Sequence, residues 1–228
     1  MAKILVLGGT GLLGTELKKI DPELICLPRR ACEIRNINDI SAVIFEYEPD
    51  MIILAAAYLN TNNAFDLIRT NIQGTANVSL ECLHQGIRLV YISSDYVYPS
   101  TKGNYKETDD LQPFNNYAWS KLGGECSVRM VQNHLIIRTS FGASEFPYPE
   151  AYNNKCTSKD YVDVIAPMIL EAAKSDMTGI INIGTESKTM FDYAIKRNKV
   201  KGKPLTDNSS PRDSSLNLDK WKAFQKSI

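Results

Sequence analysis

Several features that define whole classes of proteins are scarce or missing in this sequence of 228 residues. It has two histidines and no Cys-x-x-Cys pair, and its five cysteines are scattered, at Cys26, Cys32, Cys82, Cys126 and Cys156. Structural zinc sites need clustered Cys and His ligands, and disulfide frameworks need cysteines in pairs. We therefore expect no metal site, and we expect free thiols in a reducing, cytoplasmic environment.

The sequence also lacks an excess of positive or negative charge, and it lacks long apolar runs. Lys and Arg together number 26, as do Asp and Glu, which gives a formal net charge of zero. A neutral chain favours neither a nucleic-acid partner nor an anionic membrane surface. No apolar run approaches the roughly 20 residues that cross a bilayer. The opening MAKILVLGGTG does not have the layout of a signal peptide.

What the chain does have is an alternation of short apolar runs with amphipathic stretches. The apolar runs predict strands near 3–8, 23–28, 51–57, 87–93, 134–140 and 180–185. The amphipathic stretches predict helices near 11–19, from a cap at Asn38 or Asp39 to Tyr47, and near 64–85, 115–131 and 161–174. Strands that alternate with helices predict an α/β fold with a Rossmann-type, doubly wound parallel sheet. Residues 141–160 show no clear period and favour an ordered loop or part of a substrate-facing lobe.

A glycine-rich loop follows the first predicted strand. The segment GGTGLLG (8–14) spaces Gly8, Gly11 and Gly14 three residues apart, with Thr10 between them. Glycines there permit a tight turn and let backbone amides approach a pyrophosphate, which then faces the positive end of the following helix. Because a strand and a helix flank the loop, the segment predicts a dinucleotide site.

The end of the second predicted strand indicates which dinucleotide is used. An acidic residue there commonly binds the ribose 2′-hydroxyl of NAD, whereas arginine accommodates the 2′-phosphate of NADP. Here Arg29 and Arg30 follow Pro28, and the first carboxylate is Glu33. The sequence therefore favours NADPH as the cofactor, with NADH as the alternative.

Tyr117 and Lys121 lie four residues apart in a predicted helix, so both side chains share one face. A tyrosine has an ordinary pKa of about 10, and a nearby ammonium favours the phenolate. We therefore expect Lys121 to lower the pKa of Tyr117 and to make it a general acid. The same ammonium is expected to reach the ribose of the nicotinamide.

The fourth predicted strand ends in Ile92, Ser93, Ser94 and Asp95. Ligands of open α/β sheets bind at the carboxyl ends of the strands, so we expect Ile92 to face the cofactor. A hydroxyl at Ser94 is placed to hold the substrate oxygen that Tyr117 protonates. A cap that bonds to local backbone is the structural alternative for Ser94.

Together these motifs resemble the extended short-chain dehydrogenase/reductases, and within them the dTDP-4-dehydrorhamnose reductases. The resemblance covers most of the chain and is carried by GGTGLLG, LAAAY (54–58), SSDYVY, the stretch 113–125 around Tyr117, RTS (138–140) and PRDSSLN (211–217). It implies a reductase that transfers hydride from NAD(P)H to C4 of a nucleotide-activated 4-keto-6-deoxy sugar. It also implies that residues 1–140, completed by about 161–185, form the cofactor domain, and that 141–160 and 186–228 form a small C-terminal substrate-binding lobe.

The resemblance also implies roles for single residues. Tyr117 would donate the proton to C4, with Lys121 as its partner, while Ser94 would take a position that is usually threonine and Asp95 the acidic position beside the substrate. The remaining cofactor contacts would be Gly11, Leu12 and Leu13 at the pyrophosphate, Glu33 and Ile34 at the adenine end, and Ala56, Ala57 and Tyr58 at the middle of the cofactor.

Two departures from the family pattern concern the substrate. Phe141 stands where the family has a tryptophan that touches the sugar, and the chain is shorter than the family between Phe141 and the stretch 159–167. Two alternatives therefore stay open, namely a sugar-nucleotide epimerase or epimerase/reductase, and a non-catalytic NADP-binding regulatory subunit. The superfamily resemblance also allows a homodimer.

Overall fold

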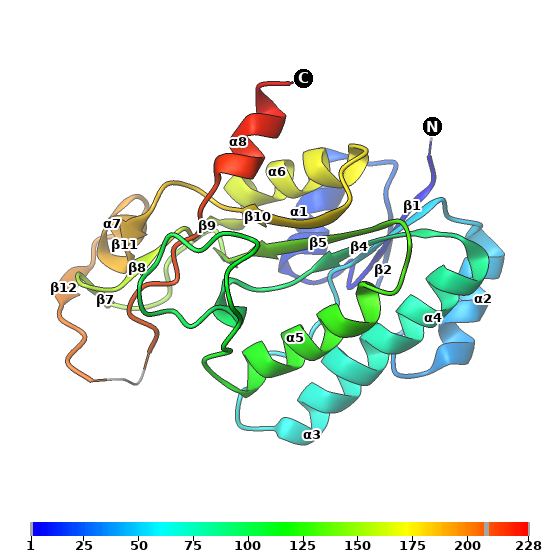
Figure 1. Ribbon diagram of the computed structural model, residues 1–228, viewed down its shortest axis with the longest axis horizontal. Coiled ribbons are helices and arrows are strands. Elements are labelled where there is room, and N and C mark those ends of the chain that lie inside the picture. The colour runs from blue at the N-terminus through cyan, green and yellow to red at the C-terminus, as the bar shows by residue number, and fades with distance from the viewer. Residues whose placement is uncertain (1, 208–209, 228) are drawn as a thin grey trace.

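A six-stranded parallel sheet forms the centre of the computed structural model, which describes residues 2–207 and 210–227 (Figure 1). The strand order is β10-β5-β4-β3-β1-β2. The strands are β1 (Ile4–Leu7), β2 (Ile25–Leu27), β3 (Met51–Leu54), β4 (Arg88–Ile92), β5 (His134–Thr139) and β10 (Gly179–Ile183). Since both faces are covered, most strand residues are apolar and buried, as parallel sheets require. The predicted Rossmann-type fold is confirmed.

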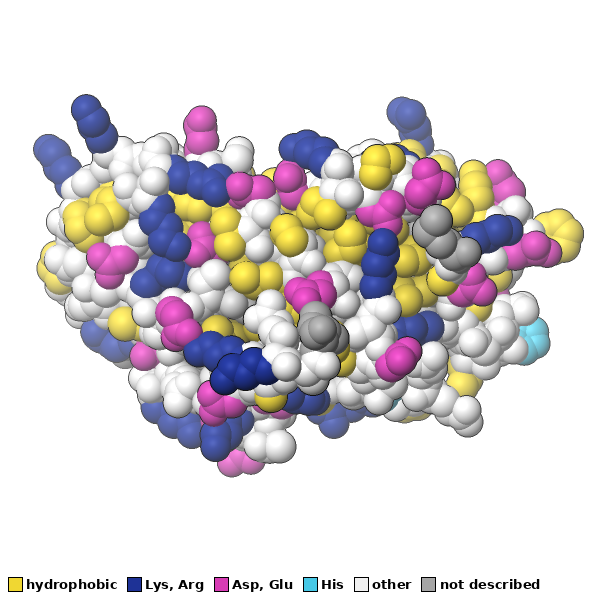
Figure 2. Space-filling view, turned by 90° about the horizontal axis from the view of Figure 1, so that it is seen from above, with side chains coloured by type: hydrophobic (Ala, Val, Ile, Leu, Met, Phe, Trp, Pro, Cys, Tyr) yellow, Lys and Arg dark blue, Asp and Glu magenta, His cyan; other side chains and the backbone are white. Residues whose placement is uncertain are grey.

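Helices cover both faces of the sheet, as Figure 1 shows. One face carries α1 (Leu12–Ile20), α6 (Val162–Lys174) and the short α8 (Asp219–Gln225). The other carries α2 (Ile37–Tyr47), α3 (Ala64–Leu67), the π-helix η1 (Ile68–Gly74), α4 (Thr75–Gln85) and α5 (Asn116–Val128). Trp221 of α8 is buried against the first face. Basic and acidic side chains are interspersed over the face that carries α6 and α8 (Figure 2), in keeping with the zero net charge.

Three local predictions differ from the structure. The cap of α2 is Asn36, whose side chain accepts a hydrogen bond from the backbone of Asn38, so the cap predicted at Asn38 or Asp39 is wrong by two or three residues. The helix predicted over 64–85 is interrupted by the π-helical turn η1. The third strand ends at Leu54 rather than at residue 57, because the chain leaves the sheet there.

Residues 141–160 are not a plain loop. They form short strands: β6 (Phe141–Gly142) pairs with β9 (Asp160–Tyr161) at the other end of the segment, whereas β7 (Glu150–Tyr152) pairs with β12 (Lys201–Lys203) and β8 (Cys156–Thr157) with β11 (Lys188–Thr189) farther along the chain. The helix α7 (Met190–Ile195) lies beside them. These pairings join 141–160 to the C-terminal segment in one lobe at the carboxyl end of the sheet (Figure 1). The division into a cofactor domain and a substrate lobe stays a prediction.

The strand order places a switch point at β1. The chain runs from β1 to β2 on one side and later to β3 on the other, so the connections diverge at the carboxyl ends of β1 and β3. Ligands of doubly wound sheets bind in the crevice at that point. Among the described residues, no helix is long and apolar enough to cross a membrane.

Candidate active site

A cleft of about 460 Å³ opens at the carboxyl ends of β1, β3, β4 and β5, and a smaller one of about 210 Å³ adjoins it beside β2. The two clefts share Gly8, Gly11, Ala55 and Ala57. Every residue predicted at the site except Arg30 lines one of them. The larger cleft has Gly8, Gly11, Leu12, Leu13, Gly14, Ala57, Ile92, Ser94, Asp95, Tyr117, Lys121 and Phe141, and the smaller adds Thr10, Arg29, Glu33, Ile34, Ala56 and Tyr58. Arg30 is exposed and lies outside both clefts.

The glycine loop is packed so closely that three of its glycines, Gly8, Gly9 and Gly14, cannot be replaced without strain. Gly8 has φ of +91°, and a Cβ there would lie 2.5 Å from the backbone nitrogen of Ala56. A Cβ on Gly14 would lie 2.5 Å from the Cα of Gly9. The helix α1 begins directly after Gly11, and no side chain caps its first amides. Its amino end is therefore open to an anionic group in the cleft.

Beside β2, the carboxylate of Glu33 is held by two arginines. Arg29 and Arg35 both donate to the same carboxylate oxygen, Oε2, each at 2.7 Å. Partial burial alone would raise the pKa of Glu33, but the hydrogen bonds from Arg35 and Arg29 lower it to about 2. Arg29 thus faces a carboxylate that the sequence placed at the adenine end. Arg35 was not predicted as a site residue, although it lies only two residues after Glu33.

The helix α5 brings Tyr117 and Lys121 into the larger cleft. Its amino end is capped by Asn115, whose side chain accepts from the backbone of Ala118 at 2.9 Å. Lys121 is only 2% exposed, and its Nζ lies 4.0 Å from the centre of the Tyr91 ring. Within the part of the chain that the structure describes, no hydrogen bond or ion pair holds this ammonium. Burial lowers the pKa of Lys121 to about 7, although the charge of Glu125 opposes that shift.

The pKa of Tyr117 differs from the prediction. Burial raises it well above the ordinary value, and the charge of Asp95 raises it further. The expected lowering by Lys121 is wrong for the protein alone, because the loss of water around the phenol outweighs the lysine one turn away. The hydroxyl is protonated at neutral pH with or without this shift, and because a higher pKa makes a weaker acid, donation requires a positive charge that stabilises the phenolate.

Ser94 and Asp95 are buried where β4 ends. The Ser94 hydroxyl accepts from the backbone of Tyr96 at 3.2 Å, which caps the short 3-10 helix η2 (Asp95–Val97), and it donates to Asp95 at 3.2 Å. Ser214 from the C-terminal segment donates to the other oxygen of Asp95 at 2.9 Å. Burial raises the pKa of Asp95 to about 6 against the hydrogen bond from Ser214. The structural alternative for Ser94 is therefore present together with its position in the cleft.

Two lysines that were not predicted from the sequence lie near Asp95 at this end of the cleft. Lys159 lines it directly, and Lys155 donates to the hydroxyl of Tyr96 at 3.2 Å. Burial lowers the pKa of Lys155 to about 8 and also lowers that of Lys159, while Asp95 favours the charged form of both. Both lysines come from the segment without a period, so no pattern in the sequence marked them.

Asn71 of the π-helix η1 fixes two parts of the site to each other. Its side-chain oxygen accepts from the backbone of Tyr58 at 2.7 Å, and its nitrogen donates to the carbonyl of Tyr58 and to the hydroxyl of Ser120, both at 2.8 Å. Ser120 in turn donates to the carbonyl of Tyr117 at 2.7 Å. The loop after β3 and the helix α5 are therefore joined by one fully buried amide. Asn71 was not predicted as a site residue either, because no motif in the sequence includes it.

One comparison with known proteins decides the family. The family described as RmlD substrate binding domain matches residues 2–169, which is well over half of the chain. The chain belongs to this family. The predicted resemblance to the extended short-chain reductases is thereby confirmed, and the match covers the glycine loop, Tyr117 and Lys121.

Individual relatives have diverse names. A dTDP-4-dehydrorhamnose reductase of Aggregatibacter actinomycetemcomitans is 28% identical over 182 residues, which cover 74% of this chain and 62% of the relative. The methionine adenosyltransferase 2 subunit beta of Bos taurus is 30% identical over 148 residues, which cover 58% of this chain and 44% of the relative. The chain thus spans less than two thirds of the length of either relative.

A solved structure shows the same fold. The dTDP-4-dehydrorhamnose reductase from Bacillus anthracis str. Ames, in complex with NADP, superposes with a TM-score of 0.85 at 24% identity. The superposition covers 98% of this chain and 91% of that chain.

Proposed function

We propose that the protein is an NADPH-dependent reductase of a nucleotide-activated 4-keto-6-deoxy sugar, for example one that reduces dTDP-4-dehydrorhamnose to dTDP-L-rhamnose. One observation carries the proposal. The buried ammonium of Lys121 has no hydrogen-bond partner and lies one helical turn from the protonated Tyr117. The same cleft holds the glycine loop and the amino end of α1, whose amides no side chain caps. An unpaired buried charge is costly unless a ligand completes it.

The residues of the two clefts fit a dinucleotide. At Gly8 and Gly14 the backbone is packed too closely for a Cβ, and the amides at the start of α1 have no side-chain partner. A pyrophosphate would be held by these amides, its adenosine would extend past Ala56 into the smaller cleft, and Lys121 would bind ribose hydroxyls in the larger one. When bound, the dinucleotide supplies the hydride.

The protein's own side chains account for the proton. Tyr117 keeps its proton at neutral pH and faces the cleft, so it is the group that donates to the sugar oxygen as negative charge develops there. The Lys121 ammonium stabilises the phenolate that remains after the transfer. Ser94 is near enough to line the same cleft and would orient the carbonyl oxygen.

The charges at the substrate end support an anionic ligand. Lys155 and Lys159 carry two positive charges against the single carboxylate of Asp95, which leaves this end with an excess of one positive charge. A diphosphate satisfies such an excess, since ammonium groups are common phosphate ligands. A nucleotide-activated sugar therefore fits better than a free sugar, and Phe141 supplies an apolar wall.

Arg29 supports NADPH over NADH. It lines the adenine-end cleft and is free on its outer side, because its side chain is 63% exposed. Glu33 is occupied by two arginines and is therefore a poorer acceptor for a ribose 2′-hydroxyl than a free carboxylate. The superposing Bacillus anthracis enzyme binds NADP.

The direct test is oxidation of NADPH, followed by absorbance, with dTDP-4-dehydrorhamnose generated from dTDP-glucose by the upstream enzymes. We expect turnover with NADPH and slower turnover with NADH. Conversion to an isomer without consumption of NADPH would support the epimerase alternative. Tight binding of NADPH without any turnover would contradict the reductase and favour the regulatory subunit, for which the likeness to the Bos taurus subunit beta and the shortened lobe speak.

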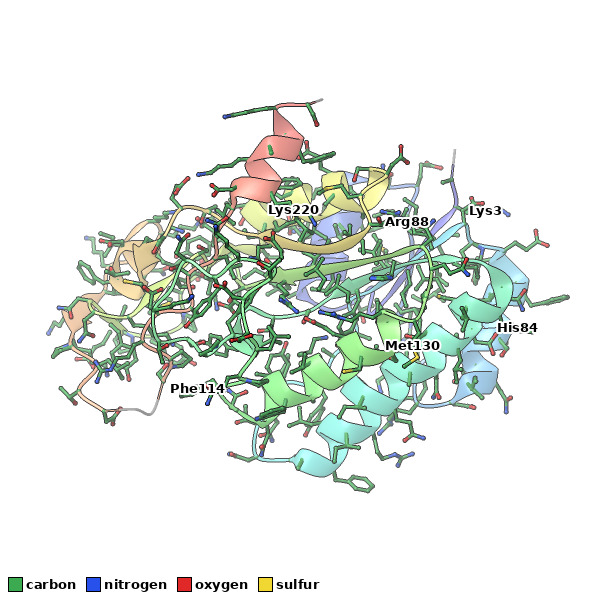
Figure 3. All side chains as sticks on the ribbon, in the orientation of Figure 1. Lys3, His84, Arg88, Phe114, Met130 and Lys220 are labelled. Atoms are coloured by element: carbon green, nitrogen blue, oxygen red, sulfur yellow. The ribbon has the colours of Figure 1, made fainter. Side chains whose placement is uncertain are left out.

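The free thiols fit a cytoplasmic location, and an apolar face fits a homodimer. Six large apolar side chains on the outer side of α3, η1, α4 and α5 are 49–71% exposed, namely Phe65, Ile68, Leu80, Leu83, Trp119 and Met130. At about 150–200 Å² for each full side chain they would bury roughly 1,200 Å² between two copies, which is the lower end for a stable interface. Figure 3 labels Met130 just beyond the end of α5.

The dimer has a matched test. Leu80→Glu and Met130→Glu should each convert a dimer to a monomer in light scattering, while Phe45→Glu should not. Phe45 is a more exposed apolar side chain on α2, outside this face. A wild-type protein that stays monomeric at high micromolar concentration would contradict the dimer.

A further inference from the structure

A fully buried ion pair lies behind the cleft and takes no direct part in the chemistry described above. Glu125 of α5 and Arg138 of β5 have no exposed side-chain surface. One Glu125 oxygen accepts from Arg138 Nε at 3.0 Å and the other from its guanidinium nitrogen at 2.7 Å. The pair is bidentate, and its hydrogen bonds raise the pKa of Arg138 despite burial.

The pair links strand ends to the helix that carries Tyr117. Ser93, the residue before Ser94, donates to the first Glu125 oxygen at 2.6 Å. On the far side, Arg138 donates to the hydroxyl of Tyr98 at 2.9 Å, and that hydroxyl donates to Asn182 at 2.9 Å. The chain of bonds therefore joins β4, α5, β5 and β10 at their carboxyl ends.

Stability alone does not explain such a pair. The cost of removing two charges from water is of the same order as their attraction, so apolar residues of equal volume often serve as well. What an apolar pair cannot do is accept the hydrogen bond from Ser93, or place a negative charge four residues after Lys121. The hydrogen bond from Ser93 and the negative charge near Lys121 both act on residues that line the cleft, not on the hydrophobic core.

We propose that Glu125 is a positioning residue for the reaction, which fixes Ser93 and Ser94 relative to α5 and holds Lys121 as an ammonium. Arg138 orients the Glu125 carboxylate through two hydrogen bonds. The proposal rests on the reductase function stated above. The hydrogen bond from Ser93 to Glu125 connects the end of β4 to α5, beside the bond from the Tyr91 hydroxyl to the carbonyl of Lys121 at 3.3 Å, and so helps to set the distance between Ser94 and Tyr117.

The charge effect can be isolated because few groups face Lys121. They are Tyr117 and Glu125 on its own helix, Tyr91 on β4, Asp95 on η2, Arg138 on β5 behind Glu125, and Lys159 across the cleft. Glu125 is the charge that favours the ammonium form. Its removal should therefore lower the pKa of Lys121 and move the alkaline limb of activity to lower pH.

The test compares three changes with one control. Ser93→Ala removes the hydrogen bond from Ser93 to Glu125 but keeps the ion pair, and we expect kcat to fall about tenfold while Tm falls by only a few degrees, with Ser93→Thr restoring most of the activity. The double variant Glu125→Leu with Arg138→Met should fold and lose at least as much. The control Arg88→Met removes another buried arginine, at the amino end of β4 (Figure 3), and should lower Tm without lowering kcat.

A second readout needs no turnover. Carbon-13 labelling of lysine side chains follows the titration of Lys121 by NMR, with Lys121→Met to assign its signal. We expect an apparent pKa that is lower by about one unit in the double variant and unchanged in Arg88→Met. An unchanged Lys121 titration together with equal kcat in Ser93→Ala would overturn the proposal. If the wild type reduces no nucleotide sugar, the reductase function fails, and the NMR titration alone still decides the role of Glu125.

Discussion

The two ends of the cleft are built in different ways. The cofactor end is made of short contiguous motifs, each at the carboxyl end of one strand, and its main groups are backbone amides and close-packed glycines. The substrate end is made of side chains far apart in sequence: Ser214 bonds Asp95 across 119 residues, and Lys155 bonds Tyr96 across 59. The cofactor end therefore depends on local conformation, whereas the substrate end depends on tertiary pairing.

The electrostatics differ in the same way. At the cofactor end, Glu33 sits near the surface and its arginine partners lower its pKa to about 2. At the substrate end, burial raises the pKa of Asp95 to about 6 and lowers that of Lys155 to about 8. Charges there are kept partly desolvated without close ion pairs, which is typical of a site that a charged ligand completes. Because different side chains control the two ends, single substitutions should affect one end without the other.

The largest effect is expected where the two ends meet, at Tyr117. Tyr117→Phe removes the proton donor without changing the shape of the cleft, so kcat should fall by about 10³-fold, within the range for a lost general acid. The affinity for NADPH, measured by fluorescence titration, should stay within about twofold. As a matched control, Tyr148→Phe changes an exposed tyrosine of the lobe and should leave kcat unaltered. Residual activity in Tyr117→Phe close to that of the wild type would show that another group donates the proton.

A smaller effect should be confined to the substrate end. Lys159→Met keeps the length of the side chain and removes its charge, so kcat/KM for the nucleotide sugar should fall about 30-fold, as expected for one lost charged hydrogen bond. The Kd for NADPH should not change. Lys199→Met, which alters an exposed lysine of the same lobe, is the control. Equal losses in NADPH affinity and in sugar affinity would mean that the two ends are not separable.

A still smaller effect should be confined to the cofactor end. Arg29→Ala removes the arginine that lines the adenine-end cleft, so the preference for NADPH over NADH should drop by about tenfold. Arg30→Ala should change it little, because Arg30 lies outside both clefts. The measurement is kcat/KM for each cofactor at saturating sugar. A larger change in Arg30→Ala than in Arg29→Ala would contradict the prediction and show that Arg30, not Arg29, binds the 2′-phosphate.

The same contrast explains what the sequence could predict. The sheet, the glycine loop and the shared helix face of Tyr117 and Lys121 follow from apolar runs and from a spacing of four residues, which are local properties. Eighteen of the nineteen residues proposed from the sequence line the clefts, and those at the adenine end and the middle of the cofactor were implied by the family resemblance rather than by local pattern. Arg30 does not, since it follows Arg29 in an exposed turn after β2 and lies outside both clefts.

What could not be predicted depends on distant pairing or on burial. Lys155 and Lys159 reach the cleft through short strands whose partners lie at 188–189 and 141–142. The amide of Asn71 is buried in a π-helical turn, which the hydrophobic pattern of the sequence does not predict. The pKa of Tyr117 is set by the loss of water in the folded cleft. The four-residue spacing therefore correctly predicted that Tyr117 and Lys121 share one helix face, but it predicted a lowered pKa for Tyr117 where the pKa is raised.

The smallest effect concerns stability and tests the burial of the substrate end. Because the folded pKa of Asp95 lies near 6, above its ordinary 3.8, the folded state holds the proton more tightly than the unfolded state. The free energy of unfolding should therefore fall as pH rises from about 4 to 6. Asp95→Asn removes this loss, so its Tm relative to the wild type should improve by a few degrees between pH 4 and pH 7.

Asp163→Asn should behave in the opposite way, since the hydrogen bond from Arg197 lowers the pKa of Asp163 and its stabilising effect is lost as pH falls. A difference in Tm between Asp95→Asn and wild type that does not vary with pH would mean that water or a counter-charge reaches Asp95, and that the substrate end is as open as the cofactor end.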